Sequence, residues 1–476
     1  MKYLKTILLI TLLFLNTVIH AQVKNYTLQD CIDLAYKQNV ALNQTELTSK
    51  MNAIILKQSK ANLYPNLFFN DGQTESFGTS YNSYTGQNSN QTIGSNSAAL
   101  SSSVNLFNGF QGVNTITQNK YLYDAGNFDV EKMKNDITLA AIDDYLAVIY
   151  AYEAMKIAKD QISTDSVQLD RTRKYLDAGK VAELSVFQME SQMAADKVAV
   201  INAENQIQLS KVALMQLMEM PITNDFDVVH YDLKEPTTEV LSTSSDDIYK
   251  TAEGIKPEIK SAALKTNAAE SGLKIAQGLD YPKITLGGEI ITGYSTARER
   301  ISYVTDIQQL NGYIVNNPNE SVLSYFPVNT SQTANYPAFD QLKDNIGEQL
   351  TLSITVPIFN NYQGKYGIEK ARLNILNAKL NEDATKNTLR KSIEQAYTDM
   401  TSSFKNYNAL KEALTTEEKT YRDMEKRYNS GLASATDFLI EKNNLTKAEF
   451  AVLQAKYDYI FKTKVVDFYL GKPITL

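Results

Sequence analysis

The chain has 476 residues, of which 47 are basic and 54 acidic, and its formal net charge is −7. This acidic balance argues against nucleic acid as a partner. One cysteine excludes an intramolecular disulfide, and two histidines leave little material for a Ser/His/Asp or Cys/His catalytic arrangement or for a histidine-rich metal site. We therefore expect no enzyme, no cofactor and no bound metal.

Residues 1–21 predict a secretory signal peptide. Lys2 and Lys5 precede an apolar run over 7–19, and residues 19–21 (Ile-His-Ala) resemble a small-residue cleavage site. The run is too short to span a membrane, and no later stretch approaches the roughly 20 apolar residues that a spanning helix needs. Any membrane contact by the rest of the chain is therefore expected from strands or from an amphipathic surface.

The rest of the chain consists of two copies of one plan. The sequence NLFNGFQG at 105–112 returns as PIFNNYQG at 357–364, a shift of 252 positions. Upstream, matching residues are 217 positions apart, so the second copy contains an insertion of 252 − 217 = 35 residues. Such a repeat indicates a duplicated architecture, with repeats at 22–224 and 246–476 joined by a linker at 225–245. The residues expected at structural turns are Pro65 and Pro282, Gly112 and Gly364, and Pro221 and Pro473.

Long helices are predicted in each repeat. No proline falls between Pro65 and Pro221, or between Pro357 and Pro473. Because proline breaks helix interiors, both stretches are free to be helical. Helices of this length have too little local core to form a compact globule, so they must pack laterally in a tube or a bundle. The expected helices cover 28–63, 113–178, 180–220, 246–280 and 432–470.

Strands are predicted between these helices. Residues 349–356 alternate strictly between apolar and polar side chains, and residues 98–106 alternate in the first repeat. Segments of about ten residues with one apolar face and one small or polar face are typical of transmembrane β-strands. Half-buried strands of a soluble sandwich are the alternative. The expected strands lie near 64–74, 96–107, 281–294 and 348–359, and a long extracellular loop over 295–347 holds the insertion.

Four spanning strands per chain are too few for a barrel. Strands in lipid must close so that no edge is exposed, and the smallest bacterial barrels have about eight strands. The sequence therefore predicts a membrane α+β fold and an oligomer, and strand counting leaves two or three copies open.

One segment carries a family resemblance. Residues 427–439, with the sequence RYNSGLASATDFL, resemble the helix-turn-helix tip of the TolC-like outer membrane efflux protein family. Residues 175–185 of the first repeat match this tip less well. The matching pattern consists of Tyr428, Gly431, Ser434, Asp437 and Leu439. Together with the duplication, the resemblance covers nearly all of the chain after the signal peptide.

The resemblance implies a homotrimer whose twelve-stranded β-barrel in the outer membrane continues into an α-helical coiled-coil tunnel across the periplasm. Members serve as passive exit ducts, while an inner-membrane transporter supplies energy and a periplasmic adaptor grips the helix tips. Asp437 matches an aspartate of the periplasmic gate, although the family's second acid falls on Ile440, and Ser185 occupies the matching position in the first repeat. The expected adaptor-docking residues are Gly179, Lys180, Val181, Gly431, Leu432, Ala433 and Ser434.

The tip residues also have a simpler interpretation. Glycine tolerates the left-handed conformation at a helix C-cap, which would account for Gly179 and Gly431. Ser434 or Thr436 could cap the following helix, with Asp437 as a solvated cap residue.

We expect a duct for small molecules in a tripartite efflux system, in contact with outer-membrane lipid, an adaptor and a transporter. Type I protein secretion is the alternative within this class. A periplasmic or surface coiled-coil structural protein is the alternative from another class. A periplasmic adaptor would need lipoyl-like and small-barrel modules, for which the repeats leave no room.

Overall fold

The structure is a computed structural model that describes residues 24–82, 86–90, 92–223, 225–231, 233, 235, 243–314 and 317–473. The expected signal peptide at 1–21 and part of the expected linker therefore lie outside the described residues. The chain forms two compact units. The helical unit takes residues 1–54, 119–269 and 374–476, and the strand unit takes residues 55–118 and 270–373.

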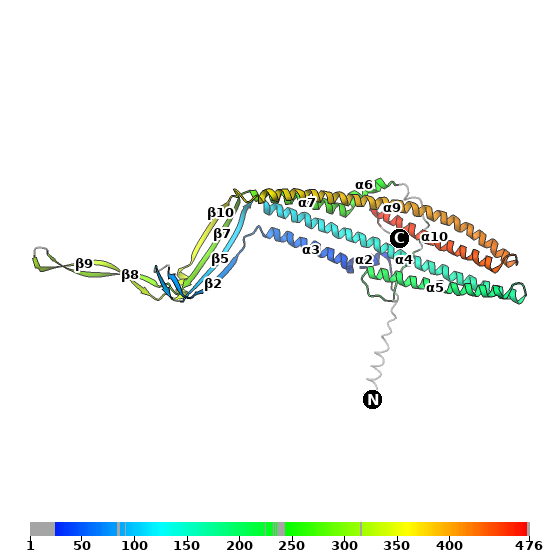
Figure 1. The fold of residues 1–476 in the computed structure, drawn as a ribbon, viewed down its shortest axis with the longest axis horizontal. Helices are drawn as coiled ribbons and strands as arrows, with labels where there is room; N and C mark the ends of the chain where they lie inside the picture. The colour runs from blue at the N-terminus through cyan, green and yellow to red at the C-terminus, as the bar shows by residue number, and fades with distance from the viewer. Residues whose placement is uncertain are drawn as a thin grey trace, which may run out of the picture. The chain divides into compact units, whose positions relative to one another are not determined.

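The duplication recurs in the bounds of the helices, which are labelled in Figure 1. Helices α4 (Gln111–Asp177) and α5 (Glu183–Leu217) in the first repeat correspond to α9 (Gln363–Asn429) and α10 (Ala435–Tyr469) in the second, always at a shift of 252 positions. Each pair forms a helical hairpin. Within the described residues, no helix is both long enough and apolar enough to cross a membrane.

The two helices expected over 28–63 and 246–280 are each broken in two. The first repeat has α2 (Leu28–Gln38) and α3 (Val40–Ala61), and the second has α6 (Ser245–Ile255) and α7 (Pro257–Gln277). Proline has no backbone N–H and forces the residue before it into an extended conformation, so Lys256 leaves the helix with ψ 130°. Asn39 makes the matching break without proline, because its Oδ1 accepts a hydrogen bond from the Leu42 amide at 3.1 Å.

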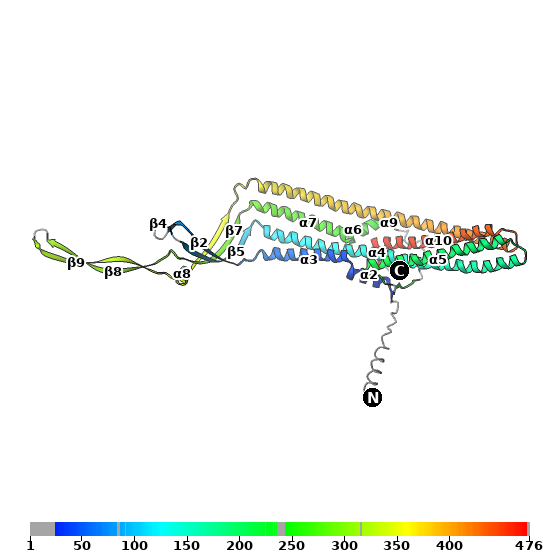
Figure 2. The same ribbon diagram turned by 60° about the horizontal axis from the view of Figure 1, so that its bottom comes forward.

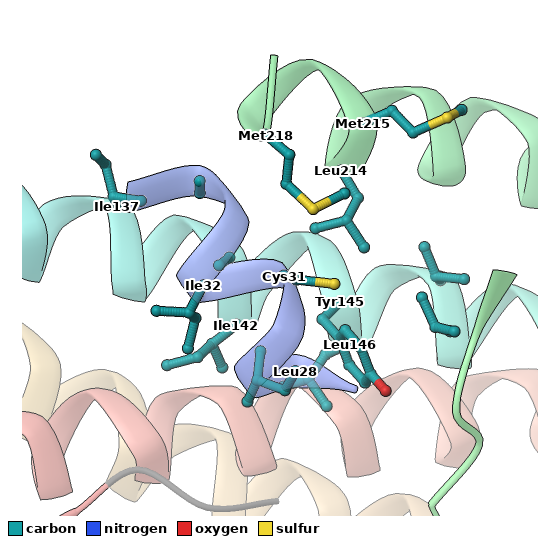
Figure 3. Packing of buried hydrophobic residues seen from close by; sticks show 14 of the residues in the cluster. Leu28, Cys31, Ile32, Ile137, Ile142, Tyr145, Leu146, Leu214, Met215 and Met218 are labelled. Atoms are coloured by element: carbon teal, nitrogen blue, oxygen red, sulfur yellow. The ribbon is translucent and has the colours of Figure 1, made fainter. Parts of the chain in front are cut away.

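The core of the first repeat lies where α2 packs against α4 and α5. Cys31 and Ile32 of α2 face Ile142 and Tyr145 of α4, and Met218 closes the cluster from the end of α5 (Figure 3). Burying such a side chain contributes about 1.5–3 kcal/mol. The short strands β1 (Lys24–Tyr26) and β6 (Phe226–Val228) pair in parallel beside this core.

The strand unit contains a four-stranded antiparallel sheet in the order β10-β7-β5-β2 (Figure 1; turned by 60° in Figure 2). Its strands are β2 (Phe68–Ser76), β5 (Ile93–Asn108), β7 (Lys283–Ser295) and β10 (Gly347–Thr355). Each repeat thus supplies two strands, and the repeats meet at the β5–β7 pair. Among the described residues, β2 and β10 each pair on one side only, so both edges of the sheet are open.

The register sorts the side chains onto two different faces. Leu352 of β10 lies opposite Leu286 of β7, which lies opposite Val104 of β5. Directly opposed residues share a face of the sheet, so the apolar face holds Phe69, Leu100, Val104, Ile284, Leu286, Ile290, Leu350, Leu352 and Ile354. Apart from Phe68, Ile93 and Ile291, the other face is small or polar, with Ser101, Ser103, Asn105, Thr285, Glu289, Gln349, Thr351 and Ser353.

The expected long loop at 295–347 is not a loop. It holds an antiparallel hairpin of β8 (Arg300–Ile314) and β9 (Asn317–Ala334), followed by helix α8 (Ala338–Asp344). Pro318 and Pro327 lie in β9. In a two-stranded hairpin both strands are edges, where a missing N–H is tolerated. A shorter hairpin of β3 (Thr79–Asn82) and β4 (Gln87–Asn90) lies between β2 and β5.

Helix α8 covers the edge of β7 beyond the end of β10. The last β10 partner on β7 is Ile291. Further along, the Gln341 side chain exchanges two hydrogen bonds of 3.0 Å with the Ser295 backbone, and Asn345 Nδ2 donates to the Gly293 carbonyl at 2.6 Å. Two amide side chains thus occupy backbone groups that the sheet leaves unpaired, which protects an edge strand.

Of the six residues expected at structural turns, four lie outside the helices and strands and two lie in helices. Pro65, Pro282, Pro221 and Pro473 lie outside the helices and strands. Gly112 and Gly364 instead lie in the first turns of α4 and α9. A Cβ at Gly112 would come within 2.9 Å of Leu63 Cδ2, and a Cβ at Gly364 would collide with the Asp280 carboxylate. These glycines therefore permit a close approach of chains. The turns themselves use left-handed residues just upstream, at Gly109 and Phe110 and at Asn361 and Tyr362.

Replacing Glu219 with glycine is expected to stabilise the helical unit by about 0.5–1 kcal/mol. Glu219 ends α5 with a φ of 52°, where its second-repeat counterpart Gly471 has 72°. A side chain at such a φ is strained, and glycine is not. Thermal unfolding of the detergent-solubilised protein measures the gain, with Glu219→Ala as a control that keeps the Cβ and should change little. An unfolding temperature no higher in Glu219→Gly than in Glu219→Ala would contradict the expected relief of strain.

Candidate functional site at the helix tips

Both helical hairpins reverse through the same C-terminal turn. Gly179 and Gly431 have φ values of 68° and 75°. The Gly179 amide donates to the Leu176 carbonyl at 2.8 Å and the next amide donates to Tyr175 at 2.8 Å, while Gly431 and its successor repeat these bonds at 3.0 and 2.9 Å. This pattern is the Schellman motif, which requires a left-handed residue where each glycine stands.

The two tips differ in how the return helix begins. Ser434 caps α10 through a capping box, because its Oγ accepts from the Asp437 amide at 3.1 Å and its own backbone amide donates to Asp437 Oδ2 at 3.4 Å. The Ser434 hydroxyl also donates to Asp437 Oδ2 at 2.7 Å. Of the two expected cap residues, Ser434 is therefore the cap, and Thr436 accepts a hydrogen bond from Gln188 at 3.0 Å. Ala182 precedes α5 without a side-chain cap. The N-terminus of α10 is the better fixed of the two.

Most of the expected docking residues lie at the surface of the tips. Gly179, Lys180, Gly431 and Ser434 are exposed, and Val181 and Ala433 are half-buried. Leu432 is 80% exposed. An apolar side chain this exposed at the apex of a hairpin is available to an apolar partner surface.

A small aromatic core joins the tips of the two hairpins. The rings of Tyr428 and Phe438 stack with centroids 4.9 Å apart. Both residues pack against Leu169, Val186 and Met189 of the other hairpin. Such pairs contribute about 0.5–1.5 kcal/mol beyond the area they bury. The α4–α5 and α9–α10 hairpins are thus docked on one another near their apices.

Polar contacts hold the same interface. The side-chain amides of Gln192 and Asn443 exchange hydrogen bonds at 3.1 and 3.2 Å. Thr172 Oγ1 lies 3.0 Å from the Tyr428 hydroxyl. On the rim, Arg171 donates to Asn429 Oδ1 at 2.8 Å. The sequence analysis did not find these pairs, because their members are about 250 positions apart and no local pattern relates them.

A buried ionic cluster was also missed. Lys442 of α10 donates to Asp165 of α4 and, at 2.9 Å, to Asp196 of α5. The side chains of Lys442 and Asp165 are 3% exposed, and that of Asp196 is 16% exposed. A lysine following Glu441 on an amphipathic helix reads as a solvated charge, so nothing local in the sequence indicates this burial.

The described parts of the chain contain no cluster of three or more His, Cys, Asp or Glu side chains that could hold a metal ion. The candidate site consists of the two helix reversals at Gly179 and Gly431, the exposed apolar side chain of Leu432, and the polar interface between the two hairpins.

Comparisons with known proteins agree with this geometry. A family profile described as outer membrane efflux protein matches residues 32–218 and 248–471, one segment in each repeat. Among solved structures, the outer membrane protein VceC of Vibrio cholerae covers 94% of this chain and 97% of its own with a TM-score of 0.70 at 16% identity. The Campylobacter jejuni CmeC outer membrane channel covers 93% and 85%, with a TM-score of 0.70 at 18% identity.

The fold is therefore that of an outer-membrane channel with long helical hairpins. The chain belongs to the outer membrane efflux protein family, which places it in the outer membrane with a periplasmic extension. Curated relatives include toxin and drug export protein A of Aggregatibacter actinomycetemcomitans, 22% identical over 78% of this chain and 71% of the relative. Outer membrane protein TolC of Salmonella enteritidis is 21% identical over 87% of this chain and 76% of the relative.

Proposed function

We propose that three copies of this chain form a passive exit duct for small molecules through the outer membrane. The observation that supports this most strongly is the sheet. It has two open edges and one apolar face, on which Leu350, Leu352 and Ile354 are 60% to 78% exposed. In lipid an open edge leaves backbone groups unpaired at a cost of several kcal/mol each. Edges β2 and β10 of sister copies pair in the proposed barrel, which then has twelve strands.

Exposed apolar stripes on the helices support the same assembly. Val40, Leu47 and Ile54 lie seven positions apart along α3 and are 51% to 63% exposed. On α5, Leu184 and Val198 lie fourteen positions apart and are 63% and 55% exposed. Apolar residues at heptad spacing form a coiled-coil seam. The seams belong, in this proposal, to contacts between neighbouring copies.

The tips are the proposed docking surface for a periplasmic adaptor, which connects the duct to an energised inner-membrane transporter. The docking residues are Gly179, Lys180, Val181, Gly431, Leu432, Ala433 and Ser434. The exposed Leu432 supports this role, since a lone apolar apex fits an apolar pocket of a partner. The duct itself conducts and catalyses no reaction.

Photo-cross-linking from position 432 in cells tests the docking proposal and separates efflux from secretion. We expect capture of a periplasmic adaptor and, through it, of a transporter for small molecules. Capture of a protein-secretion transporter would favour type I secretion instead. A chain that stays soluble without detergent would favour the coiled-coil structural protein.

We also propose that Asp437 contributes a ring of three carboxylates to the periplasmic mouth of the duct. Its role in the capping box leaves the side chain exposed. A ring of carboxylates attracts and holds cations. Asp437→Asn removes the charge and keeps an acceptor for Ser434, so we expect block of single channels by divalent cations to weaken at least about tenfold, or about 1.4 kcal/mol.

The matched control is Ser434→Ala, which removes the cap and keeps the charge. Block should then stay close to that of the unchanged protein. If Asp437→Asn leaves the block as it was, Asp437 is only a cap residue and the gate assignment is discarded.

A further inference from the structure

The ionic cluster of Asp165, Asp196 and Lys442 lies between the two helical hairpins. Both acids belong to the α4–α5 hairpin and the lysine belongs to the α9–α10 hairpin. The contact therefore exists only while the hairpins are docked. One buried cation faces two buried carboxylates, so the cluster carries one excess negative charge when both acids are ionised.

The excess charge is poorly compensated. Asp165 Oδ2 is buried without a hydrogen-bond partner among the described residues, and so is the amide nitrogen of Gln168 one turn along α4. An ionised carboxylate in such a place is costly to bury, whereas a protonated carboxyl is neutral and carries a donor. Some contacts that surround the cluster across the interface, such as Gln192 with Asn443, are neutral and do not titrate. The contact between Gln161 and Glu449 includes a carboxylate.

Burial, and then the neighbouring Asp196 carboxylate, raises the pKa of Asp165 to about 7. Burial also acts to raise the pKa of Asp196, but the hydrogen bonds of Asp196 to Asp165 and Lys442 outweigh burial and hold its pKa below the ordinary value. The pair therefore keeps one proton up to near-neutral pH.

Other titratable groups lie near the cluster on α4, α9 and α10. Burial raises the pKa of Glu449 on α10, which accepts a hydrogen bond from Gln161. This residue is the one neighbour that needs its own control. The remaining groups are Asp160 and Arg171 on α4, Glu418, Tyr421 and Glu425 on α9, and Lys411 and Lys456 across an adjoining cavity of about 610 Å³.

We propose that Asp165, Asp196 and Lys442 form a proton-operated latch that holds the α9–α10 hairpin on the α4–α5 hairpin and releases it as the pH rises. Below the transition the cluster is neutral, with one proton on the acids and one charge on each of Lys442 and its carboxylate partner. Above the transition both acids are ionised, so the docked state buries one carboxylate charge that Lys442 does not compensate. The proposal concerns contacts within one chain and does not rest on the duct function.

Linkage between proton binding and docking gives the direction of the pH dependence. In separated hairpins Asp165 is solvated and titrates near its ordinary value of about 4, while in the docked state it holds its proton to about 7. Docking is therefore strongest at low pH and weakens as the pH rises through this window. Between pH 5 and pH 8 the docking equilibrium should fall on the order of 100-fold.

Double electron–electron resonance on the full chain tests the latch. Spin labels replace the exposed tip residues Lys180 and Leu432, one on each hairpin, and labelled chains are diluted with unlabelled ones so that only distances within a chain are seen. The buried Cys31 needs no substitution, since burial raises the pKa of its thiol to about 12 and leaves it unreactive. A longer distance should grow in from pH 5 to pH 8.

Two variants separate the latch from general pH effects. Asp165→Asn has the shape of the protonated acid and should stay docked at all pH values. Glu449→Gln should respond to pH like the unchanged protein. The proposal is overturned by a distance distribution that does not change with pH in the unchanged protein, or by an equal change in Asp165→Asn. Either failure would leave the duct proposal untouched.

Discussion

Replacing Lys442 with methionine is expected to destabilise the helical unit by about 3–5 kcal/mol at pH 6, where the two hairpins are docked. The substitution leaves Asp165 and Asp196 facing each other without the cation that both contact. Removing one partner of a buried ion pair costs more than the pair is worth, because the remaining charge stays desolvated. Chemical unfolding followed by far-ultraviolet circular dichroism measures the loss, since most of the helical unit is helix.

The control for this prediction is an exposed lysine on the same pair of hairpins. Lys174 pairs with Asp170 one turn away, and its side chain is 72% exposed. Lys174→Met should cost no more than about 0.5 kcal/mol. Equal losses for Lys442→Met and Lys174→Met would show that the buried cluster does not stabilise the chain.

Replacing Leu352 with arginine is expected to block assembly in the outer membrane. Leu352 lies in the middle of β10, on the apolar face and opposite Leu286. A charge on the lipid face near the middle of the bilayer costs about 2–4 kcal/mol in each chain. Three copies in one barrel multiply that cost. The measurement is the amount of detergent-extractable oligomer in outer-membrane fractions, which should fall to a small fraction of the normal level.

The neighbouring position provides a matched control. Thr351 lies opposite Gly287 on the polar face, where side chains are small. Thr351→Arg adds the same charge one residue away but points it into the proposed water-filled lumen, so assembly should continue and conductance should change. If both variants assemble equally well, the apolar face does not contact lipid.

Much of the architecture could be predicted from the sequence because it depends on spacing. The shift of 252 positions between 105–112 and 357–364 also relates α4 and α5 to α9 and α10. The alternation over 349–356 predicted the strand that the structure shows as β10. Periodicity and internal repetition can both be recognised in a single sequence without knowledge of its three-dimensional contacts.

The errors have physical reasons. A loop is predicted over 295–347, but the structure has a hairpin there, and its prolines are compatible with the two edge strands of an isolated hairpin. The break at Asn39 depends on a side-chain hydrogen bond to Leu42, and asparagine alone does not predict it. Gly112 and Gly364 were read as turn residues, although what they permit is a close contact with a distant segment.

The candidate site was only partly accessible from the sequence. The glycine turns and the Ser434 cap follow from local hydrogen bonding, which residue types indicate well. The cluster around Lys442 joins residues 277 and 246 positions apart. Only the docking of the hairpins brings them together, and in sequence each looks like an ordinary surface charge.

Native mass spectrometry of detergent-extracted protein, followed by reconstitution of the same sample in planar bilayers, tests the central claim most directly. The structure leaves both edges of a four-stranded sheet open, so we expect complexes of three chains that form discrete ion-conducting pores. A single chain that is stable as a monomer in detergent and forms no pores would contradict the proposed duct.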